Sequence, residues 1–550
     1  MSTSEPPRRD DRGAAAGGST PQAVGAGRGV IYIAFAKFYF MFAGLVIQFR
    51  LPSMLTRAAW GSYSVVNAIT SFVNNVLITG TIQTVSRFSA QDPEQARRVQ
   101  LAGLRMHLRL GLVVAVLFIA AAPIVAWRLD GSFDSEKTAP LMLAGLIIAG
   151  NAFYAVFIGT ANGLRQFHKQ AGLDITNATS RVIGMLGMAF VGLGVFGIFA
   201  GWVVAVGIVF CAAVVWVGLP GRSDPADRIA VRPLLSFFAR VAVFLTLFNA
   251  TMFVDGILIK LTTREYFTQH AAQLGSSLDQ VIPWAAKLSG YRPDPSELAD
   301  VQTGYYAAVQ NLARLSYQAI IAVTFVVFPL VSRSTFTEDR ETTKSYIQVT
   351  VRYSLIFALA IAVVMAANPV DILGVIYAPD FAHLGGPALP WLALGNVAFS
   401  ILAINSTILN SAGATRSTIV AAAVTIGLAA IGNYIAIPLA IEANRTLEVA
   451  AAVTGGAMIV GALATGLVMR RRFEAFLPLL SAIRIGAASA VAIAVGRMLP
   501  LHGKLMSLVE AGIVAATFAA GLILTRELGA KDLEAIKAVR RKRAGNEGAV

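Results

Sequence analysis

The stretch GIFAGWVVAVGIVFCAAVVWV fills residues 197–217 and contains no charged side chain. Its 21 residues, at about 1.5 Å per residue, form a helix long enough to cross a hydrocarbon core of about 30 Å. Similar runs recur along the whole chain of 550 residues, and most lack the alternation of a strand. Because a helix satisfies its backbone hydrogen bonds internally, it is the structure that such runs adopt in lipid. The sequence therefore predicts an all-α polytopic membrane protein.

The composition excludes the other broad classes of protein. Apolar residues make up 56% of the chain and charged residues 14%, whereas a soluble domain carries about 25% charged residues. The one cysteine, Cys211, lies within the apolar run, so no disulfide forms inside the chain and no Cys/His cluster is available for zinc.

We expect about fourteen membrane-spanning helices, arranged as two six-helix lobes followed by two extra helices. The predicted spans are 29–50, 60–80, 108–127, 140–163, 171–194, 197–218, 234–260, 303–330, 349–368, 386–410, 418–440, 447–469, 477–499 and 505–525. They divide the chain into a disordered cytoplasmic tail (1–28), an N-lobe (29–218), a cytoplasmic linker (219–233), a C-lobe (234–469) with a long outer loop (261–302), the two extra helices (470–525) and a basic tail (526–550).

Lysine and arginine indicate the orientation of these spans. With the N-terminus in the cytoplasm, 28 of the 45 Lys and Arg residues fall in cytoplasmic segments and 9 in outer loops. The positive-inside rule therefore places both termini in the cytoplasm. The same bias explains most of the net charge of +15, so that charge does not require a nucleic-acid partner.

An internal repeat supports the two lobes. Spans two and eight begin with Gly61-Ser62-Tyr63 and Gly304-Tyr305-Tyr306, and they end with Val85-Ser86-Arg87 and Val331-Ser332-Arg333. Ala36-Lys37 in span one matches Ala239-Arg240 in span seven, and Gly163-Leu164-Arg165 after span four matches Gly413-Ala414-Thr415-Arg416 after span ten. Four matches in the same order predict that spans one to six and seven to twelve are equivalent units.

Polar side chains form one helical stripe in each of the two equivalent spans. Span two carries Tyr63, Asn67, Thr70, Asn74 and Thr81, and span eight carries Tyr306, Gln310 and Tyr317 at aligned positions. A polar stripe is costly against lipid, so both should face protein or water. We expect them to line a shared aqueous cavity between the lobes and to bind substrate; the alternative is hydrogen bonding between helices within each lobe.

Cations lie within the spans as well. Arg314 is about ten residues, or ~15 Å, into span eight, where a charge needs water or a partner. Lys37 and Arg240 occupy equivalent positions in spans one and seven, and Gln48 shares a face with Lys37. We expect these four residues to contact substrate in the cavity, the alternatives being snorkelling for Lys37 and Arg240 and an ion pair inside the lobe for Arg314. Other arginines are close enough to span ends to snorkel: Arg50, Arg181, Arg352, Arg484 and Arg497.

Three oxygen-bearing side chains form a candidate ion-coupling site. Asp255 is one of few acids within a span, and Asn433 and Thr454 lie in later spans of the same lobe. Carboxylate, amide and hydroxyl oxygens suit Na⁺, and the carboxylate alone could instead carry H⁺. The alternative is a structural pair between Asp255 and Lys260.

Motifs for enzymatic chemistry are missing from the sequence. There is no P-loop for ATP, no nucleophile elbow, no zinc-protease motif and no dinucleotide fingerprint, and the five histidines are scattered. We therefore expect no catalytic residues, no resident metal and no cofactor beyond Na⁺ or H⁺ as a coupling ion.

These features together resemble the multidrug/oligosaccharidyl-lipid/polysaccharide exporter superfamily, and within it the polysaccharide-biosynthesis (Wzx-type) flippases. The resemblance covers residues 29–525 and rests on the span number, the two-lobe repeat, the turns before Arg165 and Arg416, Asn433 followed by Pro438, and the alanines at 450–452. It implies a V-shaped pair of lobes in the bacterial cytoplasmic (inner) membrane, open to one leaflet at a time. The implied cargo is an undecaprenyl-diphosphate-linked glycan, and the implied partners are membrane lipids and the polysaccharide polymerase and export machinery.

Three other functions remain open at this stage. A MurJ-type lipid II flippase also has fourteen spans, but its Ser-Arg-x-x-Gly pattern is not apparent in span one. A multidrug-and-toxin cation antiporter usually has twelve spans and prefers acidic cavities, which the cations here oppose. A membrane glycosyltransferase or polymerase would use acids in the outer loop, such as Asp279, Asp294 and Asp300, but would not require the repeat.

Overall fold

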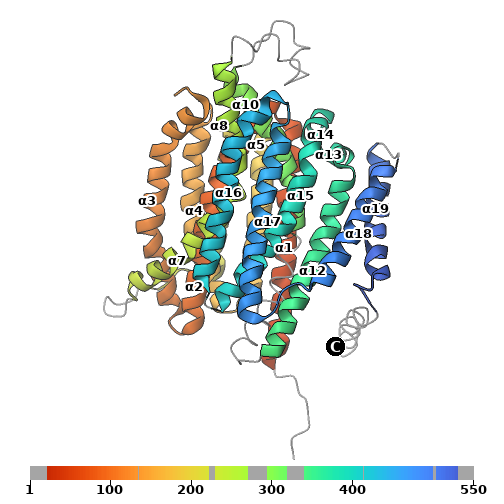
Figure 1. Ribbon diagram of the computed structural model, residues 1–550. Coiled ribbons are helices and arrows are strands. Elements are labelled where there is room, and N and C mark those ends of the chain that lie inside the picture. The colour runs from red at the N-terminus through yellow and green to blue at the C-terminus, as the bar shows by residue number, and fades with distance from the viewer. Residues whose placement is uncertain are drawn as a thin grey trace, which may run out of the picture.

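The computed structural model describes residues 21–133, 135–221, 229–270, 294–318, 340–412, 414–499 and 503–529. All regular elements in these ranges are helices, and most of them run side by side in one bundle (Figure 1). The all-α fold class is thus confirmed.

The first six helices form one packed unit. They are α1 (Pro21–Met54), α2 (Arg57–Gln91), α3 (Ala96–Asp130), α4 (Thr138–Gly163), α5 (Phe167–Phe190) and α6 (Gly194–Val217). Helix α4 packs against α2, α3 and α6, while α5 packs against α1 and α6. We refer to this unit as the N-lobe.

The second unit, the C-lobe, is built from α7 (Val231–Ala250), α8 (Val254–Gln269), α10 (Pro295–Ala313), α12 (Arg340–Ala367), α15 (Leu389–Ser411), α16 (Thr415–Glu442) and α17 (Thr446–Phe473). Three short helices join α12 to α15: α13 (Pro369–Ile376), α14 (Pro379–Gly385) and η3 (Gly386–Ala388). Helices α18 (Leu479–Met498) and α19 (Lys504–Leu524) pack on α12 at the edge of the bundle (Figure 1).

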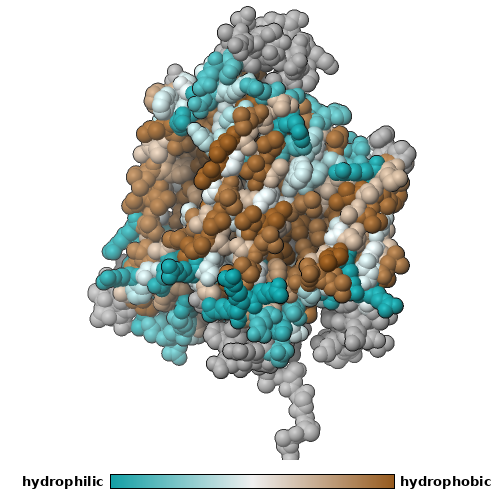
Figure 2. All heavy atoms as spheres, in the orientation of Figure 1, coloured by the Kyte–Doolittle hydropathy of each residue, from teal (hydrophilic) through white to brown (hydrophobic). Residues whose placement is uncertain are grey.

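Twelve helices of the described residues are long and apolar enough to cross a membrane. The expected fifth span, α5, has the length of a span but a polar stripe along one face, and the expected eighth span continues from α10 into residues outside the described ranges. The face in Figure 2 is hydrophobic across the middle and hydrophilic at both ends, as a multi-pass membrane protein requires.

Three predicted boundaries were wrong. Residues 21–28, expected to belong to a disordered tail, are helical, because α1 begins at Pro21. The expected span 234–260 is broken into α7 and α8 by the turn at 251–253. The expected outer loop 261–302 is shorter, because α8 continues to Gln269 and α10 begins at Pro295. The carboxylate of Asp294 caps α10 by accepting a hydrogen bond from the N–H of Ser296, and Pro295 suits the first helical position.

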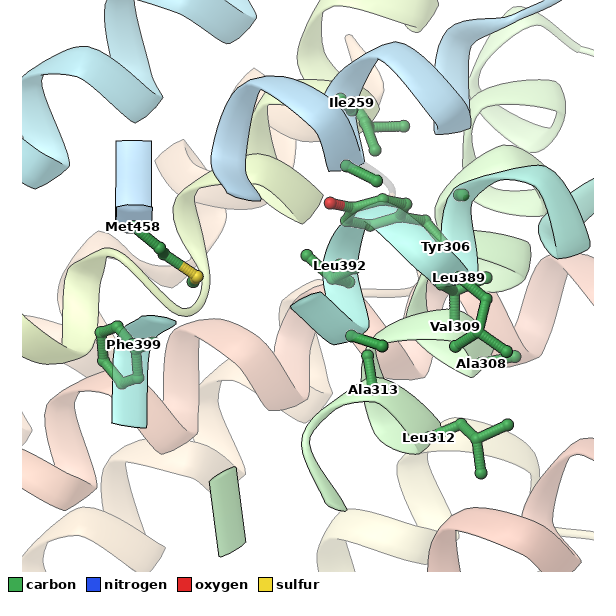
Figure 3. Close-up of a cluster of buried hydrophobic side chains, with 14 of the residues drawn as sticks. Ile259, Tyr306, Ala308, Val309, Leu312, Ala313, Leu389, Leu392, Phe399 and Met458 are labelled. Carbon is green, nitrogen blue, oxygen red and sulfur yellow. The ribbon is translucent and has the colours of Figure 1, made fainter. Parts of the chain in front are cut away.

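A buried cluster holds α10 in the centre of the C-lobe. Figure 3 shows Tyr306, Val309 and Leu312 of α10 near Leu389 and Leu392 of α15. All five are at most 3% exposed. Their burial fixes the face of α10 that carries the polar stripe.

The repeated Gly-x-Tyr motifs meet where the lobes touch. A Cβ atom on Gly61 of α2 would lie 1.7 Å from the carbonyl oxygen of Asp300, and one on Gly304 of α10 would lie 3.1 Å from the amide nitrogen of Gly61. The indole of Trp60 donates to the carbonyl oxygen of Gly304 at 2.9 Å. Only glycine permits so close an approach of two helices. The contact lies at the end of the bundle where α8 ends and α10 begins, which we call the predicted outer end.

Candidate functional site

The break between α7 and α8 places a carboxylate inside the C-lobe. Asp255 lies in the first turn of α8 and is 1% exposed. Its carboxylate accepts hydrogen bonds from the Tyr306 hydroxyl at 2.7 Å, the Gln310 side-chain amide at 2.7 Å and the N–H of Gly256 at 2.8 Å. A buried carboxylate requires such donors or a bound cation.

The other predicted ion-coupling residues join this carboxylate. The Thr454 side chain lies next to the Asp255 carboxylate, and the side-chain amide of Asn433 donates to the Thr454 hydroxyl at 2.9 Å. Both residues are fully buried. The side-chain oxygen of Asn433 is buried and has no hydrogen-bond partner within the described residues. The structure therefore brings the three residues together from α8, α16 and α17.

This donor set fits a monovalent cation better than a divalent one. Asp255, Thr454 and Asn433 offer oxygen ligands but one negative charge, and the described residues contain no group of three His, Cys, Asp or Glu side chains that could hold a metal. The unpartnered oxygen of Asn433 supplies spare acceptor capacity. Na⁺ is therefore compatible with the site, as is a proton on Asp255.

Arg314 lies beside the carboxylate network. Its guanidinium donates to the carbonyl oxygen of Met252 in the helix break and, at 3.4 Å, to the side-chain oxygen of Gln310. It also lies over the ring of Phe253, 4.8 Å from the centroid. Arg314 is thus held within the C-lobe by the break between α7 and α8 and by Gln310 of α10.

Lys260 is not the partner of Asp255. Instead, it belongs to a ring of four charges at the predicted outer end, formed by Asp130 and Lys137 of the N-lobe and by Lys260 and Asp300 of the C-lobe. Every neighbouring pair of opposite charges in the ring lies within 3.0 Å. Burial alone would lower the pKa of the Lys137 ammonium, but the carboxylates of Asp300 and Asp130 raise it above its ordinary value.

The remaining predicted cations differ in their surroundings. Lys37 of α1 pairs with Asp174 of α5 at 2.8 Å and keeps about a third of its side chain exposed (34%). Arg240 of α7 is exposed and has no polar partner within the described residues. The side-chain oxygen of Gln48 accepts a hydrogen bond from Asn311 across the lobes at 3.0 Å.

Several members of the two polar stripes contact residues of their own lobes in this structure. Tyr63 stacks on Trp60 at 5.3 Å and packs against Phe199 of α6 at 5.9 Å, both between ring centroids. On α10 and the turn after it, Tyr306 and Gln310 donate hydrogen bonds to Asp255, and Tyr317 packs edge-on against Phe399 at 5.2 Å between ring centroids.

Two asparagines in the middle of α2 have fewer contacts. Asn67 accepts a hydrogen bond from Ser71 at 3.5 Å, and the side-chain oxygen of the buried Asn74 has no partner within the described residues. Whether these residues bind substrate stays a prediction.

Sequence reasoning missed a third polar stripe, on α5. It consists of Gln170, Asp174, Asn177 and Arg181, at spacings of four, seven and eleven residues. The same periodicity that revealed the stripe on α2 would have revealed this one. The expectation that Arg181 snorkels to a span end was wrong, because its guanidinium lies over the ring of the buried Trp202, 4.0 Å from the centroid. Arg352, near the start of the apolar span Ile347–Ala367, and Arg484 of α18 in contrast both pair with Glu527.

Two family models match successive parts of the chain. One, described as polysaccharide biosynthesis protein, matches residues 51–266, and the other, MatE, matches residues 296–435. No curated protein matches the chain.

Solved structures of low sequence identity share the fold. The chain is similar to the lipid II flippase MurJ in an inward closed conformation, with a TM-score of 0.67, 13% identity and coverage of 91% of this chain and 99% of the flippase. A MATE protein in a straight conformation gives a TM-score of 0.58 at 13% identity, covering 82% of this chain and 96% of that one. A MOP superfamily transporter from Pyrococcus furiosus, described as having a binding pocket of reverse polarity, gives 0.51 at 13% identity, covering 81% and 96%.

Proposed function

We propose that this chain is a member of the multidrug/oligosaccharidyl-lipid/polysaccharide exporter superfamily, two of whose family models match successive parts of it, and that it flips a lipid-diphosphate-linked oligosaccharide across the bacterial cytoplasmic membrane. The product would feed cell-surface polysaccharide biosynthesis, together with a polymerase and export machinery. The observation that carries this proposal is the match of residues 51–266 to the polysaccharide biosynthesis model. The cationic side chains within the helices of both lobes support it.

The chemistry of the cargo agrees with these cations. A diphosphate carries negative charge that must leave water during transfer, and guanidinium and ammonium groups are its strongest partners at low dielectric constant. Lys37 and Arg181 lie in the N-lobe, while Arg240 and Arg314 lie in the C-lobe. The sugars require hydrogen bonds, which Tyr, Asn and Gln side chains supply, and the polyprenyl tail can remain in lipid.

A MurJ-type lipid II flippase is the second candidate. The similarity to the lipid II flippase over 91% of this chain favours it, and its cargo has the same diphosphate chemistry. A multidrug cation antiporter is less favoured. The acid of α5, Asp174, is already paired with Lys37, and Asp255 is only 1% exposed, so neither acid is open to a bulky cationic drug.

Transport would proceed by alternating access of the two lobes. Here the lobes are joined at the predicted outer end by the charge ring and by the Gly61–Gly304 contact, so the cargo would enter from the opposite, cytoplasmic side. Opening of this end would release the cargo to the outer leaflet.

A cation bound near Asp255 would bias this equilibrium. Na⁺ would neutralise the buried carboxylate, with Thr454 and Asn433 as further oxygen ligands. An ion shifts the equilibrium between two states only if it binds one of them more tightly. The break between α7 and α8 adjoins the site, so a change in the α8 position would change the spacing of the ligands.

The function is tested by transport in proteoliposomes. We expect the purified protein to move undecaprenyl-diphosphate-linked oligosaccharide to the opposite leaflet, measured by access of a membrane-impermeant glycosidase. Lipid II and a cationic dye are tested in parallel vesicles. Transport of lipid II alone would replace the proposed cargo by the second candidate, and movement of the dye alone would contradict both.

A further inference from the structure

Arg181 lies deep inside the N-lobe. It is nine residues before Phe190, the last residue of α5, which corresponds to about 13 Å along the helix. A guanidinium at this depth is costly without water or a partner. The groups that surround it therefore decide what it does.

The guanidinium contacts an aromatic surface rather than an acid. Trp202 of α6, over whose ring it lies, is 3% exposed. Tyr63 of α2 is 0% exposed and belongs to the same aromatic cluster as Trp202, because both rings pack against Phe199, at 5.9 Å and 6.0 Å between centroids. These contacts direct the Arg181 side chain toward the interior of the N-lobe and away from lipid.

Both polar groups at this place lack hydrogen-bond partners. The Nε atom of Arg181 and the hydroxyl of Tyr63 are buried, and neither is hydrogen-bonded to any of the described residues. Arg181 as a whole is only partly buried, so some of its surface remains reachable. Unsatisfied buried donors are rare in proteins because each costs free energy.

Two other cations within the helices, Lys37 and Arg314, have acceptor partners, whereas Arg181 has an aromatic ring. Lys37 has the carboxylate of Asp174, which lies about two turns before Arg181 on the same stripe of α5, and Arg314 has the carbonyl oxygen of Met252. The Arg181 guanidinium and the Tyr63 hydroxyl therefore have hydrogen bonds to donate and no acceptor among the described residues. A bound oxyanion would supply the acceptor oxygens and the negative charge that both groups lack.

We propose that Arg181 and Tyr63 form a binding subsite in the N-lobe for the diphosphate of a polyprenyl-diphosphate lipid. The subsite rests on the proposed function and deepens it. The guanidinium fork binds two phosphate oxygens, the Tyr63 hydroxyl donates to a third, and Trp202 holds the guanidinium in place by its ring. Trp202 is a positioning residue, because it acts through Arg181.

The subsite is tested by lipid binding to the full-length protein in nanodiscs. The probes are undecaprenyl diphosphate, which carries the anion without sugar, and undecaprenol, which has the same tail without phosphate. We expect the wild type to bind the first and not the second. Arg181→Ala should weaken binding of the diphosphate roughly 10- to 100-fold, the range for a lost charged hydrogen-bond pair. Arg181→Lys should lose less, because it keeps the charge without the fork.

Matched variants separate this role from a structural one. Arg109→Ala removes an exposed arginine of α3 that has no polar partner among the described residues, and it should leave the affinity unchanged. Tyr63→Phe removes one hydroxyl that makes no hydrogen bond to the part of the chain that the structure describes, so it should keep the thermal unfolding midpoint while weakening diphosphate binding severalfold. Trp202→Phe retains a ring and should have a smaller effect than Arg181→Ala.

The outcomes distinguish the subsite from the transport function. Equal affinity of wild type, Arg181→Ala and Tyr63→Phe for undecaprenyl diphosphate overturns the subsite. Equal binding of undecaprenol and undecaprenyl diphosphate overturns it as well, because the anion would then be irrelevant. Flipping of the lipid-linked oligosaccharide by the wild type, measured in proteoliposomes of the same preparation, tests the proposed function separately from either result.

Discussion

Lys137 of the N-lobe and Asp300 of the C-lobe form a buried salt bridge 2.7 Å long, although 163 positions separate them in the chain. Asp130 and Lys260 form the reciprocal bridge at 3.0 Å. Each lobe also contains its own pair: Asp130 with Lys137 at 2.7 Å, and Lys260 with Asp300 at 2.8 Å. If the lobes separate, each one therefore keeps a neutral ion pair, and no isolated charge remains. The two bridges between the lobes can thus hold the predicted outer end closed, and they can break without leaving an unpaired charge in either lobe.

Removing one carboxylate of the ring should favour the open state. Asp300→Asn removes the negative charge that faces Lys137 across the lobes and leaves Lys260 with one carboxylate, and loss of one partner of a buried pair costs about 3–5 kcal/mol. We expect a larger population with separated lobes, measured by electron spin distances between labels at the exposed Glu136 and Glu265 in a Cys211→Ser background. Glu94→Gln, at an exposed position near the other end of the bundle, serves as the control. An unchanged distance distribution would show that the ring does not hold the lobes together.

Exchanging charges within one lobe tests the neutral-pair argument more directly. D130K/K137D keeps the N-lobe neutral but places like charges across the interface, so the closed state should become strongly disfavoured. Adding K260D/D300K reverses the C-lobe as well and restores opposite charges across the interface. We expect the quadruple variant to recover the short label distance. Persistence of the long distance in the quadruple variant would contradict the ring as the closing element.

The glycine contact between the lobes predicts a steric effect. In Gly61→Ala the new methyl group would meet the carbonyl of Asp300, whose oxygen lies 1.7 Å from an ideal Cβ, so α2 and α10 must move apart. Overpacking of this kind costs about 1–3 kcal/mol. Gly187→Ala is the matched control, because nothing lies within 4 Å of its added Cβ. A lower thermal unfolding midpoint and a longer label distance are expected for Gly61→Ala alone; equal values for both variants would argue against close packing.

Much of the fold could be predicted from the sequence because lipid imposes helices on apolar runs of about 20 residues. The repeated Gly-x-Tyr motif marked the point where the lobes touch. The sequence did not show why glycine is needed there, which is the close approach of α2 and α10 at Gly61 and Gly304. The sequence could not show that Lys260 binds Asp130, because hydropathy carries no information on which distant charges meet. Asp255, Asn433 and Thr454 could be grouped because a buried acid requires oxygen or cationic partners nearby. Arg181 was misjudged because counting residues to a span end says nothing about the direction of a side chain.

Arg314 is expected to be essential for transport. Arg314→Ala removes the donor to the Met252 carbonyl and the only arginine of α10 and its C-terminal turn, so export of the surface polymer should be abolished while the protein still reaches the membrane. Arg314→Lys should retain partial export, because charge survives without the fork. Polymer on the cell surface is measured beside membrane levels of each variant. Normal export by a stably expressed Lys37→Ala, Arg240→Ala and Arg314→Ala triple variant would rule out these cations as the substrate contacts.

Ion coupling should depend on the Asp255 carboxylate. Asp255→Asn keeps the shape of the side chain and its hydrogen bond to Gly256 can persist, but the negative charge that would hold Na⁺ or H⁺ is gone. Transport of the lipid-linked oligosaccharide in proteoliposomes should then lose its response to an imposed Na⁺ or pH gradient. Thr454→Val removes a neutral oxygen and should weaken a Na⁺ response more than a pH response, because a proton requires the carboxylate alone. Asp92→Asn, at the end of α2, is the control. A native response to both gradients in Asp255→Asn would mean that the carboxylate is a structural hydrogen-bond acceptor for Tyr306 and Gln310.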